Sequence, residues 1–172
     1  MVKTLMNNAL SQAIKEAYAV SNVTQVILET IELRHAKLPS PIRLINQRQG
    51  LQLTLETGES FFFEAVGFSF TLPAAGENGR QDLQITIDNV DKRISAFINQ
   101  AKEFFEPVEI IYRPYLSTDL TTPQMNPPLV LTLQDVSITQ FQVQAKATFA
   151  DILNQKFPKE YYTRKRFPSL GF

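Results

Sequence analysis

The feature that most constrains this chain is an alternation of apolar and polar side chains that returns in several short segments. Leu51, Leu53 and Leu55, for example, are separated by polar residues. Side chains of a strand point to opposite faces in turn, so each segment offers one face to a core and one to water or a partner. The segments predicted as strands from this pattern, or from a β-branched composition, are residues 25–33, 51–56, 68–72, 83–88, 129–134 and 141–149.

Two further segments have the period of a helix. Residues 5–18 place apolar side chains on one face, and residues 91–105 do the same before Pro107, which cannot continue a helix. We expect the first helix either to cover the sheet or to fill a groove of a partner. Together with the strands, these segments predict a mainly β fold, an antiparallel β-sandwich or barrel-like domain with one or two flanking helices.

The C-terminal residues 154–172 follow neither period. They contain two Phe-Pro pairs, two adjacent tyrosines, and five basic residues against one acidic residue. Because residues before proline prefer an extended backbone, this composition indicates an extended arm. The arm could dock on a neighbouring subunit, pack back on its own chain or bind nucleic acid. We predict docking, with the contacts made by Phe157, Tyr161, Tyr162, Arg164, Arg166 and Phe167.

The expected domain organisation is an N-terminal helix (residues 1–22), a β-rich domain (23–153) and the extended docking arm (154–172). Two loops, residues 73–82 and 118–128, interrupt the β-rich domain. The first contains turn residues between two strands, and the second contains three of the ten prolines. We expect both to be secondary contact loops.

The composition removes several classes of function. With no cysteine and one histidine, the chain cannot form disulfides, thiolate nucleophiles or iron–sulfur clusters, and the usual zinc sites are excluded. Acidic and basic residues balance at 17 each, which argues against a dedicated nucleic-acid binder. No stretch approaches the roughly 20 apolar residues of a membrane helix. We therefore expect neither direct nucleic-acid binding nor membrane insertion.

The candidate catalytic side chains have simpler interpretations. His35 follows a predicted strand and precedes a proline turn, so it is interpreted as a strand-end histidine. The acidic pairs are interpreted as solvated charges near helix ends: Asp88 with Asp91, and Glu103 with Glu106. The prediction is a protein that is not an enzyme, with no catalytic residue, no metal ligand and no cofactor.

An ordered set of motifs runs to the C-terminus from Met125. It comprises Asn126-Pro127-Pro128, Asp135-Val136, Phe149 with Asp151 and Asn154, Phe157-Pro158, Tyr162-Thr163, and Arg166-Phe167-Pro168 with Leu170. Upstream motifs that fit the same pattern are Leu33-Arg34-His35 with Pro41-Ile42-Arg43 as an opening hairpin, residues 68–73, residues 83–90 and Tyr112-Arg113-Pro114-Tyr115-Leu116. In order and spacing this set resembles a family of bacteriophage minor tail proteins described only as a domain of unknown function, and it covers about residues 25–172.

The resemblance implies a tail-tip protein of a long-tailed phage. Its expected neighbours are the tape-measure protein, the tail tube or distal tail protein, a peptidase-like tail protein and the central fibre. Residues 87–90, followed by a helix, are also similar to the first domain of lambda-type tail-hub proteins. Those hubs commonly hold a cysteine-bound iron–sulfur cluster, which is not carried over to a chain without cysteine. The implied location is the tail tip of the virion, and the host cytoplasm during assembly.

The leading hypothesis is a structural component of the tail tip, hub or baseplate. It is expected to form a homo-oligomer, with a trimer as the first choice and a hexamer as the second. The alternative is a soluble β-sandwich module that binds a carbohydrate or a host-surface component, which the lack of tryptophan makes weaker. A hydrolase would need an acid–base pair that the sequence does not reveal.

Overall fold

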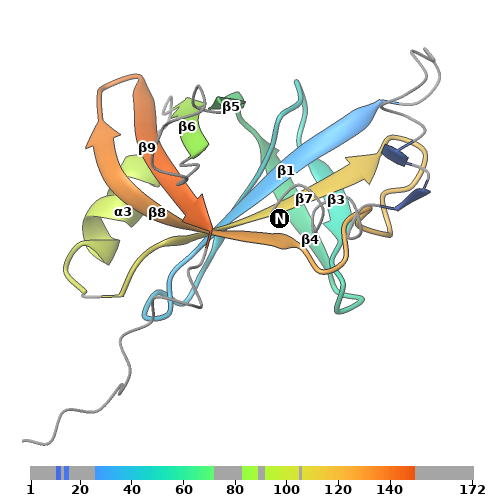
Figure 1. Cartoon of the computed structure of the whole chain (residues 1–172), viewed down its shortest axis with the longest axis horizontal. Coiled ribbons are helices and arrows are strands. Elements are labelled where there is room, and N and C mark those ends of the chain that lie inside the picture. Colours follow the sequence, from blue (N-terminus) through green and yellow to red (C-terminus); the bar gives the residue numbers. More distant parts are fainter. Residues whose placement is uncertain are drawn as a thin grey trace, which may run out of the picture.

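The computed structural model describes residues 11, 12, 14, 15, 26–71, 83–88, 92–104 and 106–149. In this part of the chain the fold is mainly β, as predicted (Figure 1). The elements with defined bounds are β1 (Ile27–Arg34), β2 (Ile42–Ile45), β3 (Leu51–Thr54), β4 (Ser60–Ala65), β5 (Phe68–Thr71), β6 (Leu83–Asp88), α3 (Arg93–Ala101), β7 (Glu109–Leu116), β8 (Leu129–Ile138) and β9 (Gln142–Phe149).

All of these strands belong to one sheet, in the order β3-β4-β2-β1-β7-β8-β9-β6-β5. Neighbouring strands are antiparallel except β2 and β4, which pair in parallel. β3 and β5 end the order and are not paired with each other, so the sheet of the described residues is not closed into a barrel. The antiparallel β prediction is therefore confirmed, in the form of an open sheet.

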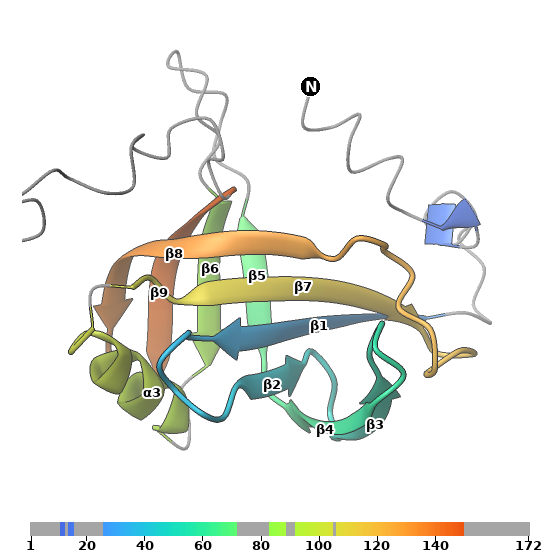
Figure 2. The same cartoon turned by 90° about the horizontal axis from the view of Figure 1, so that it is seen from below.

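The sheet bends strongly over itself. Figure 2 shows β5, β6 and β9 running across the direction of β1, β7 and β8. The bend falls in β8, whose first residues pair with β7 and whose later residues pair with β9. The β8–β9 register shifts between Gln134 and Ser137, and Asp135 has a positive φ of 50°. Such a bulge lets a single strand turn from one layer into the other.

The main core lies between the two parts of the bent sheet and α3. Alternate residues of neighbouring parts of β1 and β7 enter it, among them Ile31, Leu33 and Ile110. From α3 it receives one apolar stripe: Ile94, Phe97, Ile98 and Ala101. The sequence predicts these four residues on one stripe together with Phe105, which lies outside the described residues. The helix is shorter than residues 91–105 and ends at Ala101.

A second core lies on the opposite face of β1 and β7. Leu28 and Tyr115 point to this face, opposite to the residues of the same strands that enter the main core. The β3–β4 hairpin covers them with Leu53 and the fully buried Phe63. The centre of the sheet is thus buried on both faces, which explains why β7 shows almost no alternation in its sequence.

Three strands were missing from the strand prediction. β7 has buried residues on both faces and contains Pro114, so neither its pattern nor its composition indicated a central strand. β4 has three consecutive phenylalanines, and β2 is only four residues long. β7 lacks an alternating pattern because it is buried on both faces, and β4 lacks one because of its apolar run. β2 was recognised only as part of the expected opening hairpin.

Most of the predicted N-terminal helix lies outside the described residues, as do the loop at 73–82 and the whole arm at 154–172. In the part of the N-terminal segment that is described, Ile14 is fully buried. The backbone N–H of Ser11 donates to the backbone oxygen of Gln124 at 2.8 Å. This segment is therefore anchored to the loop that follows β7.

Gly50 lies in close contact with β4, and Gly50→Ala is expected to cost about 1–3 kcal/mol of stability in urea unfolding. A Cβ added here would lie 2.4 Å from Cζ of Phe62 and 2.7 Å from the backbone oxygen of Phe63. Gly67→Ala is the matched control, because its Cβ would meet the end of the Asp88 side chain, which can rotate away. An equal loss in the two variants would contradict this explanation.

Candidate functional site

The six arm residues predicted to contact a partner all lie outside the described residues, so the structure does not position them: Phe157, Tyr161, Tyr162, Arg164, Arg166 and Phe167. The described part of the molecule offers three other places where polar groups gather. They are the surroundings of His35, a buried ion network beside the second core, and an open pocket near α3.

His35 directly follows β1, as predicted, and is buried. Its Nδ1 accepts a hydrogen bond from the backbone N–H of Lys37 at 3.2 Å, because a backbone N–H can only donate. Nε2 therefore carries the proton and donates to the backbone oxygen of Glu106 at 2.9 Å. With both ring nitrogens used, His35 joins the β1–β2 turn to the segment between α3 and β7.

The acidic residues near α3 do not converge. The carboxylate of Glu106 lies 3.6 Å from Nζ of Lys37, at the surface, and Glu103 is exposed in the turn after α3. Asp88 ends β6, and Asp91 lies outside the described residues. Nowhere in the described ranges do three or more His, Cys, Asp or Glu side chains gather in a way that could hold a metal ion.

A network of four charged side chains lies on the face of the sheet that carries the second core. Nη1 of Arg113 is 3.2 Å from Oε2 of Glu32, and its Nε is 2.8 Å from Oε1 of Glu56. Arg43 also reaches Glu32, with Nε at 3.2 Å, and its guanidinium stacks on the ring of Phe61 at 3.8 Å. Two positive and two negative charges thus balance one another.

The register of the sheet explains how this network forms. Glu32 and Arg43 face each other across β1 and β2, while Arg113 lies one diagonal away on β7, opposite Thr30. Glu56 arrives from the turn after β3. The side chains of Glu32 and Arg113 are only 5% and 7% exposed, so their charges depend on each other rather than on water. The network therefore fixes the β3–β4 hairpin over the sheet.

Tyr115 adds a neutral hydrogen bond to the same region, since its hydroxyl donates to the backbone oxygen of Thr54 at 2.8 Å. Burial is the main reason that the pKa of this hydroxyl is well above its ordinary range. The positive charge of Arg113 acts in the opposite direction, and nearby carboxylates act with the burial. The hydroxyl of Tyr115 therefore keeps its proton in the folded structure.

Tyr115→Phe is expected to lower stability by about 1 kcal/mol near neutral pH, because the hydrogen bond is lost. Because the pKa of Tyr115 is raised in the folded protein, the stabilisation by its hydroxyl is complete at pH values below the ordinary tyrosine pKa of about 10. This stabilisation is lost as the pH rises further. Urea midpoints of the original and variant proteins should therefore draw together as the pH is raised through this range. A difference that stays constant with pH would contradict the assignment.

The predicted contact loop at 118–128 is described and is held by its own side chains. Oδ1 of Asp119 accepts hydrogen bonds from the hydroxyl of Thr121 at 2.7 Å and from its backbone N–H at 2.9 Å. These bonds, the hydroxyl first, lower the pKa of Asp119. The loop also contains a cis peptide bond before Pro127. It projects beside β3, where its Leu120 oxygen accepts from the backbone N–H of Thr54.

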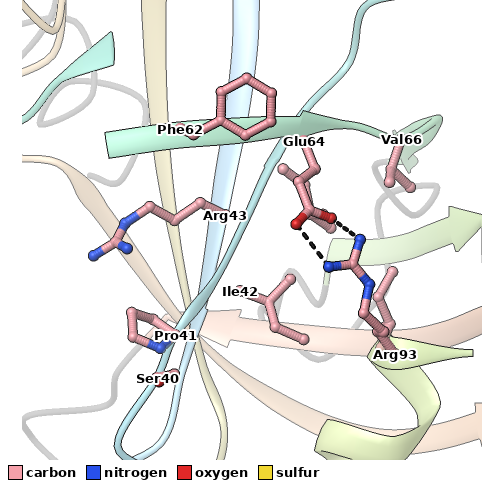
Figure 3. A pocket seen from close by; sticks show the side chains of 10 residues that line it. Ser40, Pro41, Ile42, Arg43, Phe62, Glu64, Val66 and Arg93 are labelled. Atoms are coloured by element: carbon pink, nitrogen blue, oxygen red, sulfur yellow. Dashed lines mark hydrogen bonds and ion pairs between the residues drawn. The ribbon is translucent and has the colours of Figure 1, made fainter. Parts of the chain in front are cut away.

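An open pocket of about 260 Å³ lies between β2, β4 and the first turn of α3. Figure 3 shows Ile42 facing the middle of the pocket, with Glu64 and Arg93 joined by two ion-pair contacts at one side. The guanidinium of Arg43 points away from Glu64 and Arg93. The lining residues are Ser40, Pro41, Ile42, Arg43, Leu44, Phe62, Glu64, Val66, Arg93 and Ile94.

The chemistry of this pocket favours contact with apolar groups. Its floor is aliphatic, and the ring of Phe62 at its rim is 62% exposed. The volume is below the roughly 300 Å³ at which pockets for drug-sized ligands begin, so it suits one or two side chains. No histidine lines it, and its one carboxylate, Glu64, is paired with Arg93. We take this pocket as the candidate functional site.

Sequence reasoning did not find the pocket or the ion network. Their parts were present as fragments of motifs, since Pro41-Ile42-Arg43 and Tyr112-Arg113-Pro114-Tyr115-Leu116 were both singled out. The pairing of β1 with both β2 and β7 brings these two fragments together, and the parallel pairing of β2 with β4 forms the pocket. Within the described ranges, no helix is long and apolar enough to span a membrane.

Two comparisons with known proteins bear on the family of this chain. No curated protein matches the chain significantly. A family model, described as a domain of unknown function (DUF1833), matches residues 13–162, which is most of the chain and includes every described strand. The pocket and the ion network both lie within the matched residues. The chain therefore belongs to this family, the domain of unknown function DUF1833.

Proposed function

We propose that this protein is a structural component of the distal tail of a long-tailed bacteriophage, in the tail tip, hub or baseplate. It assembles with itself and with neighbouring tail proteins, and it is not an enzyme. The resemblance of its ordered motifs to phage minor tail proteins supports this proposal. Residues 154–172 supply the docking contacts, and the β-rich domain supplies the rigid frame.

One observation supports the proposal beside the resemblance: three residues of the quoted motifs help to hold the shape of the frame. Arg43 and Arg113 form the buried ion network, and Asp135 occupies the bulge at which β8 turns between layers. Arg113 and Glu32 are buried and paired with each other, so breaking their pair is expected to destabilise the frame. A rigid frame with an aromatic arm suits a symmetric assembly, where one contact is repeated around an axis.

A second candidate function is binding of a carbohydrate or a host-surface component. The exposed ring of Phe62 beside an open pocket favours it, because sugars stack on exposed aromatic rings. A glycan array separates the two candidates. Specific, saturable binding that Phe62→Ala removes would place this function above the structural one.

The proposed function is tested in the phage genome that encodes the chain. Removing the codons for residues 154–172 is expected to abolish infectious particles and to leave heads without complete tails in electron micrographs. A matched variant, Gln140→Ala in the exposed β8–β9 turn, is expected to leave the titre unchanged. Normal titres after the deletion, with tails of normal appearance, would contradict the proposal.

A further inference from the structure

The open pocket and the start of the C-terminal segment lie at opposite ends of the same strands. Val66 of the pocket immediately precedes Gly67 and β5, and Gly67 accepts a hydrogen bond from Asp88 at the end of β6. The last strand, β9, runs the other way, so its end lies beside the beginning of β6, with Ala147 opposite Leu83. The six residues of β6 separate these two ends by about 20 Å.

The chain that follows β9 is long enough to reach another molecule. Residues 150–172 can span up to about 75 Å when extended. They carry the two Phe-Pro pairs, and each pair follows a basic residue: Lys156-Phe157-Pro158 and Arg166-Phe167-Pro168. A segment that leaves at one end of the frame, and a pocket at the other end, suit a head-to-tail contact between copies.

The chemistry of the pocket matches a Phe-Pro pair. Proline and the residue before it favour an extended backbone, so such a pair loses little conformational freedom on binding. Peptides of this kind bind in grooves lined by aromatic side chains, and the exposed ring of Phe62 lines this pocket together with Pro41. The aliphatic floor, with Ile42 and Ile94, accepts the phenyl ring, and the volume of about 260 Å³ suits one or two side chains.

We propose that the pocket between β2, β4 and α3 receives a Phe-Pro pair from the C-terminal segment of a second copy of this chain. The inference rests on the proposed function, because it identifies the surface on which the docking arm binds. Repeated from copy to copy, the contact is heterologous and closes into a ring when the rotation permits.

The absence of native cysteine allows a direct test by disulfide cross-linking of full-length protein. One chain carries Ser40→Cys at the pocket, and a second chain of different mass carries Ser169→Cys beside the second Phe-Pro pair. We expect this mixture to form the mixed dimer about tenfold faster than a control mixture, because docking raises the local concentration of the two thiols. In the control, Thr57→Cys at the exposed tip of the β3–β4 hairpin replaces Ser40→Cys.

Two further variants make the test specific. Lys159→Cys in place of Ser169→Cys asks the same question of the first Phe-Pro pair. Adding Phe167→Ala to the Ser169→Cys chain, or Phe157→Ala to the Lys159→Cys chain, should return the rate to that of the control. These substitutions lie in the arm, so they leave the described frame untouched.

Three results would overturn the inference. The first is a rate equal to that of the Thr57→Cys control for both arm positions. The second is a fast rate that the phenylalanine substitutions leave unchanged. The third comes from a chain that carries both Ser40→Cys and Ser169→Cys. If this chain forms a disulfide only within itself, the pocket binds the chain's own arm and not that of a second copy. If cross-linking fails but deletion of residues 154–172 still abolishes tail assembly, the pocket is not the docking surface and the proposed function stands.

Discussion

Arg113→Met is expected to lower the free energy of unfolding by about 3 kcal/mol, measured by urea denaturation. The substitution keeps much of the side-chain volume and removes the positive charge between Glu32 and Glu56. Glu32 stays buried with Arg43 as its remaining cationic partner. The expected cost lies at the lower end of the range for breaking buried ion pairs, because Glu56 is 24% exposed and can be hydrated.

An exposed ion pair between β1 and β7 provides the control. Arg34 and Glu109 are 2.8 Å apart, as Arg113 and Glu56 are, but the side chains of Arg34 and Glu109 are 52% and 40% exposed. Arg34→Met should therefore cost less than about 1 kcal/mol. The double variant Glu32→Leu with Arg113→Met should cost less than the sum of the two single variants, because it removes together the two charges that are almost fully buried. Equal losses for Arg113→Met and Arg34→Met would show that the network does not hold the hairpin.

Phe63→Ala is expected to cost about 3–5 kcal/mol, the range for removing a buried aromatic ring. Phe63 is fully buried in the second core, against side chains from β1, β3 and β7. Its neighbour Phe62 points to the other face of β4 and is 62% exposed. Phe62→Ala should therefore cost no more than about 1 kcal/mol.

This pair of variants tests the second core with the same residue type at adjacent positions. Urea unfolding followed by circular dichroism gives both values under the same conditions. If Phe62→Ala were as damaging as Phe63→Ala, the assignment of faces in β4 would be wrong. If neither variant lost stability, the β3–β4 hairpin would not be part of the folded core.

The sequence predicted the strands that have one buried and one exposed face. β3, β6 and β9 follow the alternation that the sequence shows, and so does the first half of β8. The stripe of Ile94, Phe97, Ile98 and Ala101 on α3 was also predicted, because a helix on the surface keeps its period of 3.6. These elements could be predicted because each is buried on one side only, so apolar residues recur in the sequence with the period of the element.

β7 could not be predicted in the same way, because its burial depends on a hairpin far away in the sequence. The β3–β4 hairpin covers the face of β7 that would otherwise meet water, so the alternation disappears. The ion network has the same origin, since Glu32, Glu56 and Arg113 come from three separate segments. Only the pairing of strands brings these charges together.

The pocket was equally hidden from the sequence. It requires the parallel pairing of β2 with β4, which places Glu64 level with Leu44 and leaves space against the start of α3. A parallel pair between short strands has no sequence signature of its own. The arm, by contrast, was recognisable from its composition alone, and its docking remains a prediction because residues 154–172 are outside the described residues.

The proposed function requires that the protein assembles through its C-terminal arm. The most direct measurement is the mass of the full-length protein in solution by light scattering, compared with a variant carrying Phe157→Ala and Phe167→Ala. We expect a closed oligomer for the original chain, with a trimer as the first choice and a hexamer as the second, and a monomer of about 19.5 kDa for the variant. An oligomer of the same mass in both proteins, or a monomer in both at every concentration, would contradict it.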